Sequence, residues 1–280
     1  MKKILITGAF SYIGQSLEAW LSKRPGYSVD TIDMRDPSWK NKSFSGYDAV
    51  FHVAGIVHIK DNCQNAALYT EINRDLAYKT AAKAKRDGAS QFIFMSSMSV
   101  YGLDTGVIGK DTVPAPKSAY GTSKLEAEEL IGTLSSPGFV TSIVRAPMVY
   151  GKGCRGNYAR LERLALKTPA FPDVKNQRSM IYISNLCEFI RLLIDNPRGG
   201  VFFPQNAYYV CTSELAALIA KVNGKKLFLF GAAKPLIRRL KKGTVAKMFG
   251  DLVYEKSLSA FDIDYRPYDL EASILDMYRR

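Results

Sequence analysis

Cysteine and histidine are scarce in this chain of 280 residues, which has four cysteines and two histidines. The cysteines, Cys63, Cys154, Cys187 and Cys211, stand far apart and form no CxxC pair. Neither a zinc site nor a disulfide framework is expected from such spacing. We therefore predict a protein with no metal site that works in a reducing compartment, the cytoplasm.

Long apolar runs are also missing. No stretch approaches the roughly 20 apolar residues that a membrane-spanning helix needs. After the two N-terminal lysines the apolar run stops within a few residues at Thr7 and Gly8, which predicts a strand and not a secretory signal. The chain is 47% hydrophobic and 23% charged, ordinary for a soluble globular enzyme. Its length suits one large α/β domain, or a nucleotide domain with a small lobe.

Acidic residues are outnumbered by basic ones, 26 to 39, and the net charge is +13. Such a charge favours an anionic small substrate, an anionic membrane surface or nucleic acid, and it also occurs on solvated surfaces with no partner. No aromatic-basic recognition module is present, so nucleic acid is not expected. The most basic stretch, residues 234–247, has three open interpretations. In the first, it forms the rim of the substrate site and attracts a diphosphate, which Lys247 contacts. In the second it contacts a membrane surface, and in the third it is a solvated helical face.

The N-terminus has the pattern of a strand, a glycine-bearing turn and a helix. Residues 2–7 predict a short buried strand, and the helix follows from residue 12. Backbone N–H groups and the helix dipole at such a turn face a pyrophosphate. Ser11 stands where the pattern has a middle glycine, so it adds a Cβ atom close to the phosphate. The predicted cofactor contacts in this turn are Gly8, Ser11, Tyr12, Ile13 and Gly14.

Asp33 ends the second predicted strand, residues 28–33. A carboxylate at this place accepts hydrogen bonds from an adenosine ribose and disfavours a 2′-phosphate, which predicts NAD. Arg35 follows two residues later and can pair with a 2′-phosphate, so NADP stays open. The segment 34–47 is short and is predicted to be a short helix or a loop.

The next strand, residues 48–55, is predicted to be buried and to end in Ala54 and Gly55, whose small side chains let a cofactor pass over the strand end. His52 lies in this apolar run, and we interpret it as a core histidine and not a catalytic one. A helix is predicted from about residue 68 to residue 86, and it contains Asn73.

Three residues carry the chemistry. Residues 91–95 predict a strand that delivers Ser97, and Tyr120 and Lys124 lie one turn apart on a helix. A lysine ammonium at that distance favours the phenolate and lowers the tyrosine pKa from about 10, which makes a general base. Ser97 can hold the same substrate oxygen by a hydrogen bond. A tyrosine and a lysine four residues apart are common by chance, so the prediction depends on the combination with the N-terminal turn.

The combination of TGAFSYIG, HVAG, SSMSVYG and YGTSK resembles the extended short-chain dehydrogenase/reductase superfamily and, within it, nucleotide-sugar epimerases of the UDP-glucose 4-epimerase type. The resemblance implies an α/β fold, a doubly wound parallel sheet (Rossmann-like) with a small C-terminal substrate-binding lobe. We expect a dinucleotide-binding core at 1–151 and a lobe that takes up most of 152–280, with about 178–196 returning to the core. Homodimers are the family's habit and are expected by analogy alone.

The same resemblance assigns roles to further residues. It implies that Asn73 braces the active site and that Lys124 also binds the nicotinamide ribose. Arg178 aligns with an arginine that clamps the diphosphate of a nucleotide sugar, a task that suits its planar donors. Met148 stands where related epimerases have an asparagine that contacts the substrate.

The activity implied is 4-epimerisation of a nucleotide-linked hexose through a transient 4-keto intermediate, with Tyr120 as base and NAD as hydride carrier. A reductase of a 4-keto-6-deoxy nucleotide sugar that uses NADH or NADPH is the alternative, because it needs the same residues. A non-catalytic dinucleotide sensor is a third interpretation, which the intact Tyr-Lys pair disfavours. The family's 4,6-dehydratases carry an acidic pair where this chain has Met98 and Ser99, so dehydration is not expected.

Overall fold

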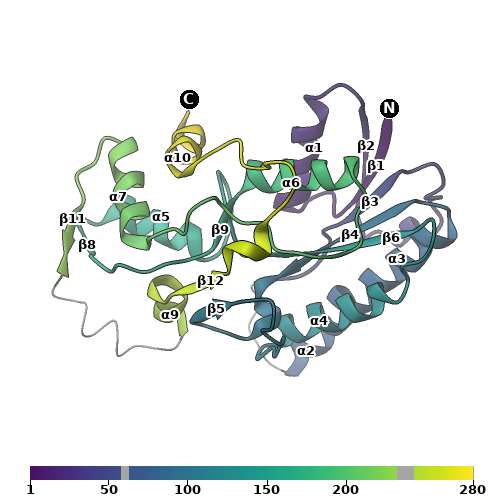
Figure 1. Ribbon diagram of the computed structural model, residues 1–280, viewed down its shortest axis with the longest axis horizontal. Coiled ribbons are helices and arrows are strands. Elements are labelled where there is room, and N and C mark those ends of the chain that lie inside the picture. The colour runs from purple at the N-terminus through teal and green to yellow at the C-terminus, as the bar shows by residue number, and fades with distance from the viewer. Residues whose placement is uncertain (58–62, 232–242, 280) are drawn as a thin grey trace. The chain divides into compact units, whose positions relative to one another are not determined.

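The computed structural model describes residues 1–57, 63–231 and 243–279, and it divides into two compact units. The first unit comprises residues 1–102, 113–146 and 187–204, and the second comprises residues 103–112, 147–186 and 205–280. Each unit is therefore built from three separate stretches of the chain. Figure 1 labels their elements.

Within the described residues, the first unit contains a six-stranded sheet in the order β10-β6-β4-β3-β1-β2, in which every pair of neighbours is parallel. The predicted doubly wound parallel sheet is thus confirmed. Its strands are β1 (Lys2–Thr7), β2 (Tyr27–Ile32), β3 (Ala49–His52), β4 (Gln91–Ser97), β6 (Val140–Ala146) and β10 (Gly200–Phe202).

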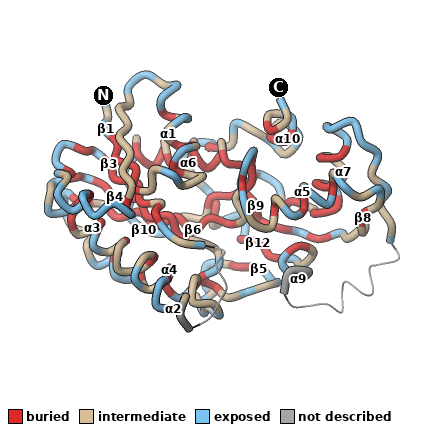
Figure 2. The backbone as a smooth tube through the Cα atoms, turned by 180° about the vertical axis from the view of Figure 1, so that it is seen from behind, coloured by how far each residue is buried: buried red, intermediate tan, exposed pale blue. Residues whose placement is uncertain are grey.

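Helices cover the sheet because its central strands are apolar on both faces. On one face Leu5, Val50 and Phe92 pack in a buried cluster with alanines of α3 and with Ile131 of α4. The helices α1 and α6 lie on the other face (Figure 1). Figure 2 shows the sheet as the most continuously buried part of the chain. The helices of this unit are α1 (Tyr12–Ser22), α2 (Cys63–Tyr69), α3 (Leu76–Arg86), α4 (Ala119–Gly132) and most of α6 (Ile183–Asp195).

One predicted helix differs in detail from the structure, and the short connection after Asp33 agrees with its prediction. The helix predicted from about residue 68 starts earlier, with α2, and passes through a π-helix at Thr70–Asp75 before α3 begins. The segment 34–47 forms a short 3₁₀ helix, Pro37–Lys40, as expected of a curtailed connection. A π-helical turn is rare and often marks a functional site; here it contains the buried Asn73.

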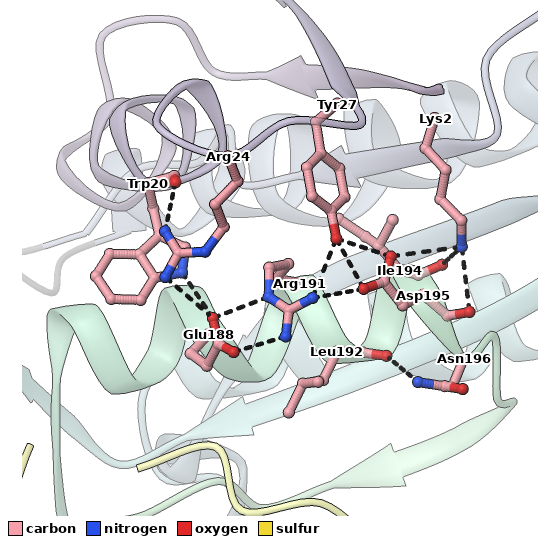
Figure 3. A network of polar contacts seen from close by, with 10 residues as sticks. All are labelled: Lys2, Trp20, Arg24, Tyr27, Glu188, Arg191, Leu192, Ile194, Asp195 and Asn196. Carbon is pink, nitrogen blue, oxygen red and sulfur yellow. Dashed lines mark hydrogen bonds and ion pairs between the residues drawn. The ribbon is translucent and has the colours of Figure 1, made fainter. Parts of the chain in front are cut away.

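The first unit is held together across a long sequence separation by a polar network (Figure 3). Arg191 of α6 donates to the carboxylates of Glu188 and Asp195 at 2.7 and 2.6 Å. Tyr27 donates to Asp195 at 2.7 Å, and Lys2 donates to two carbonyls at the end of α6. These bonds attach the returning segment 187–204 to the amino ends of β1 and β2.

The second unit has three parallel strand pairs among its described residues, β5 with β12, β7 with β9, and β8 with β11. Its core is rich in tyrosine: Tyr150, Tyr158, Tyr254 and Tyr265 are all fully buried. Its strands are β5 (Gly106–Ile108), β7 (Met148–Tyr150), β8 (Ala170–Pro172), β9 (Met180–Tyr182), β11 (Phe228–Phe230) and β12 (Leu252–Tyr254). Its helices are α5 (Asn157–Lys167), α7 (Thr212–Val222), α9 (Gly243–Phe249) and α10 (Leu270–Tyr278).

No helix among the described residues is long and apolar enough to cross a membrane.

Candidate active site

The glycine-bearing turn between β1 and α1 is closely packed. Gly8 has a φ of +123°, which favours glycine, and a Cβ atom there would come within 2.8 Å of the backbone nitrogen of Ala54. A Cβ atom at Gly14 would meet the Ser11 hydroxyl at 2.5 Å. The turn therefore requires both glycines and brings the end of β3 against it.

Ser11 is the N-cap of α1. Its Oγ donates to the Gly8 carbonyl at 2.7 Å and accepts from the Gly14 N–H at 3.0 Å. Its φ of −77° is open to any residue, so no glycine is required here. The first two helical residues, Tyr12 and Ile13, point backbone N–H groups out of the helix at the positive end of its dipole. The turn thus keeps donors for an anion although serine replaces the middle glycine.

Asp33 follows β2 directly and forms an ion pair with Arg35. The Arg35 Nε lies 2.9 Å from Asp33 Oδ1, and Nη2 lies 2.9 Å from Oδ2. Hydrogen bonds from Arg35 hold the pKa of the Asp33 carboxyl below its usual range. The guanidinium also lies 5.0 Å from the ring centre of the exposed Phe10. Asp33, which favours NAD, and Arg35, which would suit NADP, therefore form an ion pair with each other.

Ser97 and Tyr120 are brought together. Ser97 ends β4, and Tyr120 lies in the first turn of α4, whose N-cap Ser118 accepts from the Gly121 N–H at 3.1 Å. The Ser97 hydroxyl lies close enough to the Tyr120 phenol to lower its pKa. Ser97 also donates to Ser99 at 3.1 Å.

The predicted effect of Lys124 on Tyr120 is wrong in this structure. Burial raises the pKa of Tyr120 to about 12, and the Ser97 hydroxyl opposes that rise only in part. The Lys124 Nζ instead donates to the Met95 carbonyl at 2.9 Å and lies 4.6 Å from the centre of the Phe94 ring. Burial also lowers the pKa of Lys124, to about 8. Sequence spacing placed both groups on one helix face, but it could not show that Lys124 is buried and bonded to the Met95 carbonyl while Tyr120 is half-buried.

Asn73 links the π-helix to the candidate site. Its Oδ1 accepts from the Ile56 N–H at 2.9 Å, and its Nδ2 donates to the Ile56 carbonyl at 3.0 Å and to Ser123 at 3.3 Å. A Cβ atom at Gly55 would meet Asn73 Oδ1 at 2.8 Å and Lys124 Nζ at 3.6 Å. Gly55, Asn73 and Lys124 are therefore neighbours.

His52 is a core histidine, as predicted. It is fully buried, bonds Thr7 at 2.7 Å and stacks on Phe92 and Phe94. Burial lowers its pKa to about 3, so it is neutral at physiological pH. No cluster of metal-ligating side chains occurs among the described residues.

Sequence reasoning missed a pair of buried charged residues on α4 and β6, the elements next to Ser97. Glu128 of α4 and Arg145 of β6 form a buried ion pair at 2.6 Å, joined by Ser96 and Tyr101. The available signal was a single arginine near the end of the otherwise uncharged strand β6, directly after Ile143 and Val144.

Three of the predicted substrate contacts belong to the second unit, whereas Ser97 belongs to the first. Met148 opens β7 and is half-buried. Arg178 is buried, and its Nη1 donates to the Gly250 carbonyl at 2.8 Å. Lys247 is exposed on α9. The rest of the basic stretch lies mainly outside the described residues, so its three interpretations stay predictions, as do the roles of these three residues.

The chain was compared with models of protein families. A model of the NAD dependent epimerase/dehydratase family matches residues 4–204, which include the turn, Ser97, Tyr120 and Lys124. The chain belongs to this family. Family membership makes it an enzyme of the extended short-chain dehydrogenase/reductase type.

Individual members of the NAD dependent epimerase/dehydratase family resemble the chain along most of its length. It is 29% identical over 246 residues to UDP-glucose 4-epimerase of Vibrio cholerae, which covers 78% of this chain and 75% of that protein. The solved UDP-glucuronic acid 4-epimerase of Bacillus cereus in complex with NAD has a TM-score of 0.76 at 21% identity, covering 99% and 95%. A dTDP-4-dehydrorhamnose reductase of Bacillus anthracis in complex with NADP has a TM-score of 0.75 at 20% identity, covering 99% of both chains. The two solved structures show that the fold is shared.

Proposed function

We propose that this protein is an NAD-dependent nucleotide-sugar 4-epimerase of the UDP-hexose class. The observation that carries the proposal is the placement of Ser97 at the carboxyl end of β4 and of Tyr120 in the first turn of α4, one helical turn from a buried Lys124. This arrangement suits removal and return of a hydroxyl proton beside a hydride transfer. The similarity to UDP-glucose 4-epimerase supports the substrate class.

The first unit fits a dinucleotide. The backbone N–H groups of Tyr12 and Ile13 at the start of α1 suit a pyrophosphate, and the Asp33 carboxylate suits a ribose. Lys124 and Asn73 would lie at the nicotinamide end, beside Gly55. When bound, the nicotinamide supplies the acceptor and donor of the C4 hydride.

Tyr120 and Ser97 act on the proton and the oxygen of the C4 hydroxyl. Tyr120, in its phenolate form, would take the proton of the C4 hydroxyl, and Ser97 would donate a hydrogen bond to the same oxygen. In the second half-reaction Tyr120 would give the proton back to that oxygen, which restores the phenolate and the C4 hydroxyl. We keep Met148, Arg178 and Lys247 as the proposed substrate contacts.

The test begins with protein purified without added cofactor. After denaturation, near-stoichiometric release of NAD or NADH is expected, because an epimerase must retain its cofactor between half-reactions. Conversion between UDP-glucose and UDP-galactose, and between their N-acetyl forms, is then followed by chromatography. Tyr120→Phe should lower turnover by about 100-fold or more, whereas Tyr208→Phe, an exposed matched control, should not. Full activity of Tyr120→Phe would contradict the proposal.

A second candidate is the reductase of a 4-keto-6-deoxy nucleotide sugar, which uses NADH or NADPH once per turnover. The raised pKa of Tyr120 favours it, because a protonated phenol is ready to donate to a carbonyl oxygen. Arg35 beside Asp33 leaves a cation for the 2′-phosphate of NADPH. Protein that purifies empty and oxidises NADH or NADPH only with a 4-keto sugar nucleotide would establish this activity in place of epimerisation.

A further inference from the structure

The face of α4 that carries Tyr120 and Lys124 continues for one more turn to Glu128. The three residues are spaced by four, so they lie in one row along the helix. Glu128 is only 5% exposed. Arg145 donates to both oxygens of this carboxylate: Nη2 lies 2.6 Å from Oε2, and Nε lies 3.0 Å from Oε2 and 3.2 Å from Oε1. Ser96 also donates to Oε1.

The partners of Glu128 come from the strands beside the candidate site. Ser96 immediately precedes Ser97 on β4, and Arg145 of β6 is its partner in the strand register. The Arg145 Nη1 also donates to the Tyr101 hydroxyl at 2.7 Å, in the short 3₁₀ helix Met98–Tyr101 that follows Ser97. One carboxylate therefore connects α4 to the residues on both sides of Ser97.

A buried ion pair is costly to form, and apolar side chains of similar volume often give equal or greater stability. Stability is therefore a weak reason for this pair to lie here, and its connections suggest another. We propose that Glu128 is a positioning residue: through Ser96 and Arg145 it fixes the strand end that presents Ser97 against the helix that presents Tyr120 and Lys124. The reaction it serves rests on the function proposed above.

The charge of Glu128 also acts on Lys124, one turn away. The titratable groups that interact with the Lys124 ammonium are Glu128 from its own helix and His52 from β3, which is neutral. Of these Glu128 supplies negative charge that favours the ammonium, against the opposing effect of burial. Loss of that charge should move the Lys124 titration to lower pH.

Glu128→Gln tests the proposal, with Glu129→Gln, an exposed neighbour on the same helix, as the matched control. We expect Glu128→Gln to lower kcat about 100-fold, as small misplacements of reacting groups do. KM should stay within about threefold, because ground-state binding is kept. The pH profile of kcat should lose its limb near pH 8 or shift it downward, and Glu129→Gln should match the wild type throughout. Wild-type kcat and pH profile in folded Glu128→Gln would overturn the proposal.

The double variant Glu128→Gln/Arg145→Met separates positioning from charge balance. It removes both buried charges, so it should recover thermal stability while kcat stays low. Recovery of wild-type kcat would show that Glu128 serves only to neutralise Arg145, and would overturn the proposal.

Hydrogen exchange distinguishes this proposal from the proposed function. Peptides covering residues 91–101 and 119–132 should exchange faster in Glu128→Gln than in Glu129→Gln, with or without a known substrate. If the wild type converts no nucleotide sugar but this difference is found, the proposed function fails and the positioning role stands. Equal exchange in the two variants would overturn the positioning role.

Discussion

The parallel sheet of the first unit has a polar network at each end, and the two are built differently. At the carboxyl ends of β4 and β6, Glu128 and Arg145 are almost fully buried, with side chains 4% and 10% exposed. At the amino ends of β1 and β2, Arg191, Glu188 and Asp195 are 19%, 15% and 28% exposed (Figure 3). The first network joins elements that carry candidate catalytic residues, and the second joins segments distant in sequence. The buried network at the carboxyl ends thus connects the elements of the candidate site, and the network at the amino ends connects distant parts of the fold.

The largest expected effect breaks the carboxyl-end network. Arg145→Met leaves the Glu128 carboxylate buried without its cationic partner, which typically costs about 3–5 kcal/mol. Urea unfolding followed by circular dichroism measures the loss. A change below about 1 kcal/mol would show that this pair behaves like a surface ion pair and would remove the contrast between the two networks.

The second expected effect is a pH dependence of the folding stability that is caused by His52. This residue lies on β3 at the same end of the sheet. Its pKa is about 3 in the folded chain against 6.5 unfolded, so between these values the unfolded state binds one more proton. Stability from this residue is complete above pH 6.5 and falls by about 1.4 kcal/mol per pH unit as the pH is lowered toward 3.

Unfolding measured at several pH values in the wild type and in His52→Gln tests the effect. The wild type should lose stability more steeply than the variant below pH 6.5. Parallel curves would show that His52 becomes protonated without unfolding.

A smaller effect is expected at the amino-end network. Arg191→Met removes bonds to Glu188, Asp195 and Tyr27, but these partners reach water. We expect about 1–2 kcal/mol of destabilisation and no change in dinucleotide binding or turnover in the folded protein. A loss of turnover as large as that of Glu128→Gln would merge the two networks into one functional system.

The smallest effect concerns Ser11. Ser11→Ala should cost about 1 kcal/mol through the lost N-cap, and Ser11→Gly only a few tenths. Because the Ser11 hydroxyl bonds inward to Gly8 and Gly14, Ser11→Gly should leave the dinucleotide dissociation constant within about threefold. A large gain in affinity would show that the serine obstructs the cofactor.

The turn at Gly8–Gly14 and the core role of His52 could be predicted from the sequence, because glycine placement and apolar runs are local signals, and the parallel sheet followed from the family resemblance. The catalytic role of Ser97, Tyr120 and Lys124 stays a prediction. The wrong effect of Lys124 on Tyr120, and the missed pair of Glu128 and Arg145, share one cause. Burial and pairing depend on strands that are adjacent in space and distant in sequence, and spacing along one helix does not report them.

The split of the first unit has a consequence for how the chain folds during synthesis. Lys2 bonds the carbonyl of Ile194, 192 residues later, and β10 joins the sheet at Gly200. A ribosome must therefore make most of the protein before the edge strand and α6 exist. Contacts of such sequence separation close slowly, so the nascent sheet keeps an open edge at β6 from the synthesis of that strand until β10 has been made. Chaperone dependence in the cell is expected to concentrate in this interval.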